Sequence, residues 1–462
     1  MSARRITDYS RFLSKTSALR QPSAIRALQP LMNLPGMISL GGGNPNPSTF
    51  PFAKASLTLR NGESVEIGEK DMAAALQYGA SAGSPGLLSW LKQLQQAEHG
   101  SKAGLFRDLS APGAYTPKDW DICIGTGSQD LLLRTFEMLL DPQTDSVLVE
   151  SPCYSGVLAG LRPHLGANPG AVVGVGTDEH GLRPDRVDTV LRNWPTLEQD
   201  PTARARPRVL YTIPAGGNPT GTTQPEHRRR ELYEVAREHD LLIVEDDPYY
   251  YLQYGEGERA PSFLALDEDA RVLRTDSFSK IVSAGMRIGF ATGPAPLVDR
   301  LVLHAQAGCL HPSGIAQATL LAYLNHIGVE GFLKHCDEVA DFYRSRRDVF
   351  CEAADRHLKG LAEWHSPDAG MFVWFRLLGE IQDSAPLIRT KAAEKRVLLV
   401  PGESFMPECG DGGIVSSFPL GAQEDGSQST GTSPYVRASF STADAEQIDQ
   451  ALQRLAAVIR EG

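Results

Sequence analysis

The feature that most constrains the fold is an alternation of short apolar runs with longer helical segments between residues 120 and 280. Residues 209–212, 241–244 and 272–275 are short β-rich runs, and residues 225–239 have the spacing of an amphipathic helix. Strands that alternate with helices form βαβ units, whose sheet is mostly parallel and covered by helices on both faces. The sequence therefore predicts the α/β class, with further strands at 121–124 and 146–149 and helices at 130–140 and from Ser84.

The length of 462 residues predicts more than one domain. Residues 301–350 are helical in pattern, and two strand candidates (371–375 and 397–400) and a terminal helix at 444–459 follow. We expect an N-terminal arm at 1–50, a large domain at 51–330 and a smaller α+β domain at 331–462. The stretch 407–434 is rich in Gly, Ser and Asp, which predicts a mobile surface insertion, and a functional lid is the alternative.

Charge and composition exclude several classes of protein. The net charge of −11 argues against nucleic acid or an anionic membrane surface as the main partner. No apolar run reaches 18 residues, so no membrane-spanning helix is expected. The six cysteines form no C-x-x-C pair, which predicts reduced thiols, no disulfide framework and no metal site. The first 26 residues hold five arginines and one acid, which is typical of a mitochondrial transit peptide or, as we expect, of an ordered arm of the mature enzyme.

The most informative segment is Asp276-Ser277-Phe278-Ser279-Lys280, which Arg287 follows seven residues later. The Lys280 amine can form a Schiff base with an aldehyde cofactor. The hydroxyls of Ser277 and Ser279 and the guanidinium of Arg287 can bind a phosphate. A lone lysine is more often a solvated surface charge, but the combined pattern follows a strand, where ligands bind at the edge of a parallel sheet.

Two more segments carry polar groups at strand ends. Asp246 ends a buried apolar strand, where a carboxylate is costly unless it is paired, and a protonated pyridine nitrogen would pair with it. Tyr249 could hydrogen-bond the hydroxyl of the same ring. The alternative for Asp246 is a cap on the next turn. Asn218 lies in a Gly/Pro loop, could donate to the ring oxygen, and precedes a proline that is a candidate cis peptide.

The remaining candidates are a turn, an aromatic residue and an arginine. The turn Gly125-Thr126-Gly127-Ser128-Gln129 precedes a helix, whose N-terminus can bind phosphate, but Asp130 stands where a dinucleotide motif has its third glycine. Tyr154 can stack on a pyridine ring, or be a core tyrosine. Arg437 lies in an apolar strand-like run and needs an anion, which is a substrate carboxylate or an internal salt bridge.

Together these motifs resemble the aminotransferases of class I and II, which are fold type I enzymes dependent on pyridoxal 5'-phosphate. Within that family the chain resembles the kynurenine/2-aminoadipate aminotransferases and the fungal aromatic amino acid aminotransferases. The resemblance runs from about Tyr9 to the C-terminus. The matching segments are 22–26, 38–43, 75–78, 88–91, 245–250, 277–280 and 435–440.

The resemblance implies a role for each matching position. Lys280 is similar to the Schiff-base lysine, Asp246 to the partner of the pyridine nitrogen, and Tyr154 to the residue that stacks on the ring. Tyr249 and Asn218 correspond to ligands of the ring hydroxyl, and Arg437 to the clamp on the substrate α-carboxylate. The implied phosphate ligands are Ser128, Gln129, Ser277, Ser279 and Arg287, with Tyr78 reaching the phosphate of the neighbouring subunit of a homodimer. Arg26 and Gly43 correspond to the substrate pocket, which is why we expect an arm and not a cleaved leader.

The resemblance also implies the fold and the reaction. The fold would be a large domain with a mostly parallel sheet of the seven-stranded type, sandwiched by helices, plus the small domain. The reaction would be ping-pong transfer of an amino group from tryptophan, phenylalanine, tyrosine, kynurenine or 2-aminoadipate to 2-oxoglutarate or phenylpyruvate, with indole-3-pyruvate as one product. The alternatives are a pyridoxal-phosphate β-lyase and, less favoured, a regulator built on the same domain. The expected compartment is the cytoplasm, with the mitochondrion as the alternative.

Overall fold

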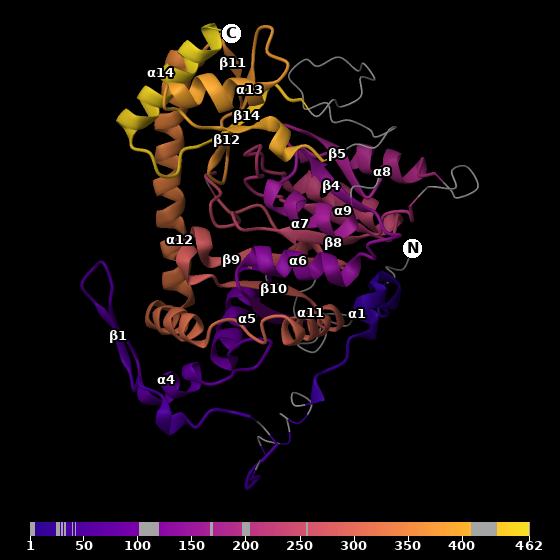
Figure 1. The fold of residues 1–462 in the computed structure, drawn as a ribbon, viewed down its shortest axis with the longest axis vertical. Helices are drawn as coiled ribbons and strands as arrows, with labels where there is room; N and C mark the ends of the chain where they lie inside the picture. The colour runs from indigo at the N-terminus through magenta and orange to yellow at the C-terminus, as the bar shows by residue number, and fades with distance from the viewer. Residues whose placement is uncertain are drawn as a thin grey trace. The chain divides into compact units, whose positions relative to one another are not determined.

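The computed structural model describes residues 5–461 except 25–27, 29, 30, 32, 33, 39, 42, 101–119, 167–169, 196–203, 256 and 408–431. The chain forms two compact units (Figure 1). The first comprises residues 1–141 and 267–335, and the second comprises residues 142–266 and 336–462. The division expected from the sequence, at residues 50 and 330, stays a prediction.

The first unit holds an antiparallel group of strands in the order β3-β10-β9. Its elements are η1 (Ser10–Phe12), α1 (Lys15–Leu19), η2 (Pro47–Thr49), β1 (Ala55–Thr58), β2 (Ser64–Ile67), α4 (Glu69–Leu76), α5 (Pro85–His99), β3 (Trp120–Gly125), α6 (Ser128–Leu139), β9 (Val272–Ser277), η3 (Phe278–Lys280), η4 (Ala284–Met286), β10 (Gly289–Pro294), α11 (Ala295–Ala307) and the first part of α12 (Gly314–Leu358). The helix expected from Ser84 is α5, and Ser84 caps it by accepting from the Leu87 N–H.

Strand β10 determines which residues meet at one end of this group. In its register Gly289 pairs with both Gly125 at the end of β3 and Ser277 at the end of β9. The turn after β3 and the segment after β9 therefore begin side by side, at the same edge of this group of strands. This places two of the phosphate-binding candidates, Ser128 and Ser279, near one another in the chain's first unit.

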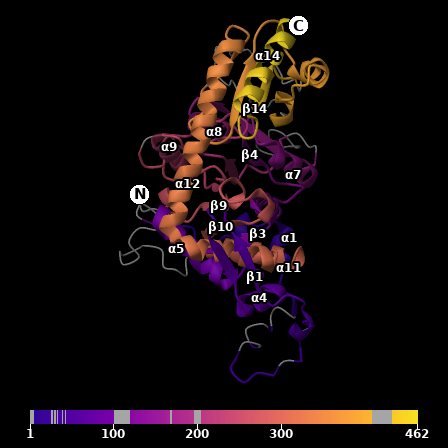
Figure 2. The same ribbon diagram turned by 90° about the vertical axis from the view of Figure 1, so that its left-hand side faces the viewer.

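Residues 6–20 of the N-terminal segment pack into the first unit. Tyr9 and Phe12 are buried, and the Tyr9 hydroxyl donates to the Ala270 carbonyl at 2.7 Å. Helix α1 lies beside α11 (Figures 1 and 2), where Arg300 donates to the Ser17 carbonyl at 3.2 Å. The arm is therefore anchored to the folded first unit over residues 9–20.

The second unit holds the parallel strands, in the order β8-β7-β4-β5, with the short antiparallel β6 at the edge. Its elements are β4 (Val147–Ser151), α7 (Ser155–Leu165), β5 (Val172–Asp178), β6 (Gly181–Leu182), α8 (Pro184–Arg192), β7 (Val209–Thr212), α9 (Glu226–Glu238), β8 (Leu242–Asp246), α10 (Phe263–Leu266), the rest of α12, β11 (Ala362–Glu363), β12 (Phe372–Leu377), α13 (Ser384–Leu387), η5 (Ile388–Ala392), β13 (Val400–Pro401), η6 (Gly402–Phe405), β14 (Tyr435–Ser439) and α14 (Ala445–Arg460).

The parallel strands are buried along their length and are joined by helices, as the alternation in the sequence predicts. Tyr211 of β7 pairs with Val149 of β4 and Val244 of β8, so the carboxyl ends of the three strands lie at one edge. Ser151, Thr212 and Asp246 are the last residues of these strands. The predicted fold class, a mostly parallel sheet covered by helices with a smaller α+β region, is confirmed.

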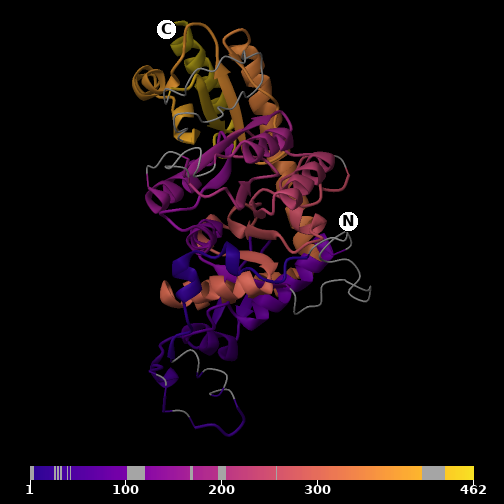
Figure 3. The same ribbon diagram turned by 90° about the vertical axis from the view of Figure 1, so that its right-hand side faces the viewer.

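The C-terminal part of the second unit is an antiparallel sheet in the order β11-β12-β14-β13. Helix α14 begins with a capping box of Asp444 and Gln447, and it lies beside β14 (Figure 2). Figure 3 shows these orange and yellow segments from the opposite side. The strand expected at 397–400 is shorter than predicted, because only Val400 and Pro401 pair with β14.

The expected insertion at 407–434 lies outside the described residues except at its two ends. The five cysteines in the described part, which exclude Cys409, are free thiols. Among the described helices, none combines the length and the apolar character needed to cross a bilayer.

Candidate functional site

In the first unit, the segment after β9 forms a short turn that presents two hydroxyls and an amine. Ser277 ends β9, and its hydroxyl accepts from the Ser279 N–H at 3.2 Å, which caps η3. Lys280 is the last residue of η3, and its side chain is half-buried. The local sequence therefore places Ser277, Ser279 and Lys280 on one tight turn at the end of a buried strand.

Arg287 connects this turn to the turn after β3. Its Nη1 donates to the Ser279 hydroxyl at 3.3 Å and to the Ala284 carbonyl at 3.1 Å, and its Nη2 lies 3.4 Å from the Thr126 carbonyl. Its backbone has φ of 53°, in the left-handed region. Four of the phosphate-binding candidates thus lie around the ends of β3 and β9, namely Ser128, Ser277, Ser279 and Arg287.

The start of α6 forms the other side of this arrangement. Its N-cap is Gly127, which has no side chain to satisfy the first N–H groups of the helix. A Cβ atom at Gly127 would lie 2.4 Å from Arg287 Nη2, and one at Gly289 would lie 2.6 Å from the Ser128 nitrogen. Glycine allows these close approaches, which bring the N-terminus of α6, the two hydroxyls and the guanidinium together as groups that can donate to an anion. We call Ser128, Gln129, Ser277, Ser279 and Arg287 the phosphate cup, and its composition fits a phosphate monoester.

In the second unit, Asp246 ends β8 with only 2% of its surface exposed. Its Oδ2 accepts from the Tyr211 hydroxyl at 2.9 Å. Tyr211 is fully buried on the neighbouring strand β7, and burial followed by the charge of Asp246 raises its pKa well above the usual value. The phenol therefore stays a hydrogen-bond donor to Asp246. A buried carboxylate that already accepts one hydrogen bond fits a protonated ring nitrogen as its second partner.

Tyr249 lies close to Asn218, Tyr154 and Arg437. Burial first, and then the charge of Asp246, raises its pKa above the usual value, while the Asn218 side chain acts as its hydrogen-bonding partner and lowers that pKa. Asn218 precedes a cis peptide bond to Pro219, which confirms the expectation from the sequence. Tyr154 is the N-cap of α7, after a second cis bond at Pro152 that the sequence did not predict.

Arg437 lies in the middle of β14, and its guanidinium faces aromatic rings. Nη1 donates to Asn218 Oδ1 at 2.8 Å, and the guanidinium carbon lies 4.3 Å from the Phe372 ring centre and 5.0 Å from that of Phe405. In the part of the chain that the structure describes, no carboxylate lies within ion-pair distance of this side chain. The internal salt bridge that the sequence left open is therefore absent among described residues, and a partly desolvated cation remains for an external anion.

Among the described residues, the structure does not bring Tyr78 or Gly43 into contact with these clusters. Tyr78 is 54% exposed, and the edge of the His311 ring lies 6.3 Å from its own ring. Gly43 is exposed, with nothing within 4 Å of a Cβ atom built on it. Arg26 lies outside the described residues.

Sequence reasoning missed three residues that shape the second unit's cluster. Tyr211 is separated from Asp246 by 35 positions, and only the parallel register makes them neighbours. Phe372 and Phe405 face Arg437 from β12 and η6. Successive side chains of a strand point to opposite faces, but both strands are continuously buried, and no sequence signal pairs β7 with β8 or sets their register.

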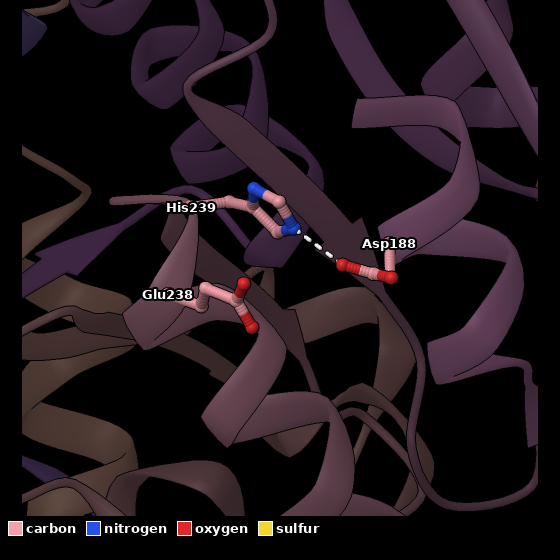
Figure 4. Close-up of side chains that lie close together, drawn as sticks. All are labelled: Asp188, Glu238 and His239. Carbon is pink, nitrogen blue, oxygen red and sulfur yellow. Dashed lines mark hydrogen bonds and ion pairs between the residues drawn. The ribbon is translucent and has the colours of Figure 1, made fainter. Parts of the chain in front are cut away.

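A separate group of possible metal ligands consists of Asp188, Glu238 and His239 (Figure 4). His239 Nε2 lies 2.7 Å from Asp188 Oδ1. Arg192 already bonds both carboxylates, at 2.8 Å to Asp188 and 2.5 Å to Glu238, and Arg206 Nη2 lies 2.6 Å from His239 Nδ1. Guanidinium groups thus occupy the positions that a cation would need, and the group is an ion-pair network that joins α8 to α9.

A family model described as aminotransferase class I and II matches residues 106–455. The chain is 45% identical over 456 residues to the mitochondrial kynurenine/α-aminoadipate aminotransferase of Bos taurus, covering 98% of this chain and 99% of that one. The aromatic aminotransferase Aro9 of Candida albicans has a similar structure, with a TM-score of 0.80, 25% identity and 98% of each chain covered. A kynurenine aminotransferase of Pyrococcus horikoshii, solved with PMP and kynurenine, has a TM-score of 0.69, 27% identity and 98% of each chain covered.

Proposed function

The chain belongs to the class I and II aminotransferases, which depend on pyridoxal phosphate, and we propose that it moves the amino group of an aromatic amino acid, kynurenine or 2-aminoadipate to a 2-oxo acid. The acceptors we propose are 2-oxoglutarate and phenylpyruvate. The observation that carries the substrate class is Arg437, a cation without a carboxylate partner among the described residues that lies between two aromatic rings.

We propose that this chain binds pyridoxal phosphate as its cofactor. When bound, the cofactor supplies an aldehyde that takes up the amino group and an electron-withdrawing ring that makes the substrate's α-proton removable. The phosphate cup would hold the phosphate, and Asp246 would keep the ring nitrogen protonated. Tyr249 and Asn218 would bind the ring hydroxyl, and Tyr154 would cover the face of the ring.

The protein's own groups would carry the proton transfer. Arg437 would bind the α-carboxylate through its planar fork and so orient the Cα–H bond. Lys280, released from the cofactor by the incoming amino group, would take the α-proton from Cα and return a proton as general acid. The second half-reaction would run in reverse with a 2-oxo acid in the same site, which is why ping-pong kinetics are expected.

We propose a homodimer in which Tyr78 of the partner subunit contributes to the phosphate site. Its support is the exposure of Tyr78 and of large apolar residues before it in the single chain, such as Ile38 at 88%, Leu40 at 97% and Phe52 at 64%. The compartment we propose is the cytoplasm. The mitochondrion is the alternative, because the Bos taurus relative is named as a mitochondrial enzyme. Arg26 and Gly43 are proposed to line the substrate pocket.

A panel of amino donors tests the proposed function. Purified protein with pyridoxal phosphate is offered tryptophan, phenylalanine, tyrosine, kynurenine and 2-aminoadipate, each with 2-oxoglutarate, and the glutamate formed is measured. We expect parallel double-reciprocal plots and the highest kcat/KM within this set. Release of pyruvate and ammonia from a substrate with a β-leaving group, without glutamate formation, would instead indicate the β-lyase.

A further inference from the structure

The loop that carries Asn218, residues 213–224, is held at its two ends by a pair of buried charged side chains. These ends, which we call the neck, are Ile213 and Pro214 at the start and Gln224 at the finish. The Gln224 N–H donates to the Pro214 carbonyl at 2.8 Å and closes the neck. Neither charged side chain has a role in the proposed reaction.

Glu150 holds the neck from β4. Its side chain lies at the carboxyl end of the strand with 6% of the residue exposed. Oε1 accepts from the Ile213 N–H at 3.1 Å, from Gln224 Nε2 at 3.4 Å and from the Thr212 hydroxyl at 2.5 Å. One carboxylate oxygen therefore binds both ends of the loop.

Arg229 holds the same neck from α9. It is fully buried, and its guanidinium donates to backbone carbonyls: Nη2 to Pro214 at 3.0 Å, Nε to Gln224 at 2.8 Å and Nη1 to Pro261 at 2.9 Å. Both charged side chains thus bind each end of the loop. At each end, a nitrogen of the loop donates to Glu150 and a backbone carbonyl accepts from Arg229. Buried charges are costly unless they are fully hydrogen-bonded, so displacement of the neck would leave both groups unsatisfied.

The tip of the loop has little room to adjust. Gly216 packs against Gly370, and a Cβ atom at Gly216 would lie 2.7 Å from the Gly370 nitrogen. Asn218, two residues later, bonds Arg437 at 2.8 Å and partners Tyr249. A small shift at the neck would therefore move Asn218 away from one of these two partners.

We propose that Glu150 and Arg229 are positioning residues of the amino-acid site, which together fix the neck of the 213–224 loop so that Asn218 contacts Arg437 and Tyr249 at once. The inference rests on the proposed role of Asn218. It makes the binding of the substrate carboxylate and the protonation of the ring hydroxyl depend on Glu150 and Arg229, although neither side chain contacts these groups.

The test compares Arg229→Met and Glu150→Leu, which remove the donors and the acceptor, with Glu150→Gln, which keeps an acceptor oxygen. Arg228→Met is the matched control, because Arg228 lies on the same helix and bonds Asp178 at 3.0 Å, outside the loop. Three readouts are measured beside kinetics. The first is amide hydrogen exchange of residues 213–224 in the protein without cofactor. The second is the dissociation constant of 3-phenylpropionate, an unreactive aromatic carboxylate. The third is the pH midpoint of the bound cofactor's visible absorbance.

We expect Arg229→Met and Glu150→Leu to speed hydrogen exchange in the loop and to shift the absorbance midpoint. They should also weaken 3-phenylpropionate binding about tenfold, which corresponds to about 1.4 kcal/mol of binding free energy. KM for the amino donor should rise more than kcat falls. Glu150→Gln and Arg228→Met should stay near the wild type in all readouts.

Three outcomes would overturn the proposal. In the first, both variants melt at a lower temperature but keep wild-type exchange, analogue binding and midpoint, which would make the two residues merely structural. In the second, Glu150→Gln loses as much as Glu150→Leu. The third outcome applies if Arg229→Met does not fold, in which case Arg229→Lys replaces it. The proposal is then overturned if Arg229→Lys and Glu150→Leu fold and show wild-type hydrogen exchange in the loop. Asn218→Ala separates the two levels, because an unchanged midpoint and analogue affinity in that variant would instead refute the proposed role of Asn218.

Discussion

Lys280 ends the turn after β9, beside the phosphate cup, and the proposed chemistry depends on its amine. We expect Lys280→Ala to lower transamination by at least about a thousandfold, because covalent attachment and proton transfer are lost together. The folded state should be unchanged, since the side chain is only half-buried. Activity is measured as glutamate formed, and folding by circular dichroism.

The matched control for Lys280 is Lys395→Ala, which removes an exposed ion pair with Glu461 at 2.5 Å. It should retain full turnover. Borohydride should attach the cofactor to the wild type and to this control, but not to the Lys280 variant. Wild-type turnover by Lys280→Ala would refute the assignment.

Glu150 also predicts a dependence of stability on pH. Burial, as the largest cause, raises the pKa of its carboxyl to about 7, from an ordinary value of 4.5. The folded state therefore binds the proton more tightly than the unfolded state, so the free energy of unfolding falls as pH rises from about 4.5 to 7 and stays lowered above that. The loss is on the order of 3 kcal/mol.

Glu150→Gln cannot ionise, so its stability relative to the wild type should improve between pH 5 and pH 8. Urea denaturation at the two pH values measures this difference. A difference between the two proteins that does not change with pH would contradict the raised pKa.

At the scale of elements, the N-terminal arm should contribute substantially to stability. Phe12 is 1% exposed, and α1 is bound to α11 through Arg300 and through His304, whose Nε2 lies 3.0 Å from the Ser17 hydroxyl. We expect Phe12→Ala to cost about 3–5 kcal/mol of unfolding free energy, because it leaves a cavity in a packed core. Leu19→Ala, at an 80% exposed position of the same arm, is the control and should cost little. Denaturation in urea measures both variants.

Strand β10 is an element that its local sequence does not predict. Gly289, Gly293 and Pro294 are poor strand formers, and the sequence did not predict a strand there. A Cβ atom at Gly289 would lie 2.8 Å from the Asp276 carbonyl oxygen, and one at Gly293 would lie 3.0 Å from the Val272 carbonyl oxygen. The glycines are thus required by close packing against β9, which local propensity does not encode. By contrast, β7 and α9 follow the predicted ranges closely, because β7 is a short, continuously apolar run and α9 has the spacing of an amphipathic helix.

At the scale of the whole molecule, the proposed homodimer would complete the phosphate site. We expect sedimentation to give two chains per particle, and Tyr78→Phe to weaken cofactor binding about tenfold without changing that mass, because one hydrogen bond to a phosphate is lost. Tyr343→Phe is a control on a tyrosine that has no proposed role. A monomer that retains the cofactor and full activity would contradict the shared site.

The sequence by itself determined the class of the fold and most of the chemical groups. The continuous apolar runs of β4, β7 and β8 and the amphipathic spacing of α9 reflect short-range geometry. Reactive side chains such as Lys280, Asp246 and Arg437 lie in short local motifs of the sequence. Only the tertiary structure decided which of these groups meet. The contact of Tyr211 with Asp246, the two rings at Arg437 and the neck held by Glu150 and Arg229 all join positions 5 to 219 residues apart. Strand register and the packing of loops create such contacts, and neither property is encoded in any single segment of the chain.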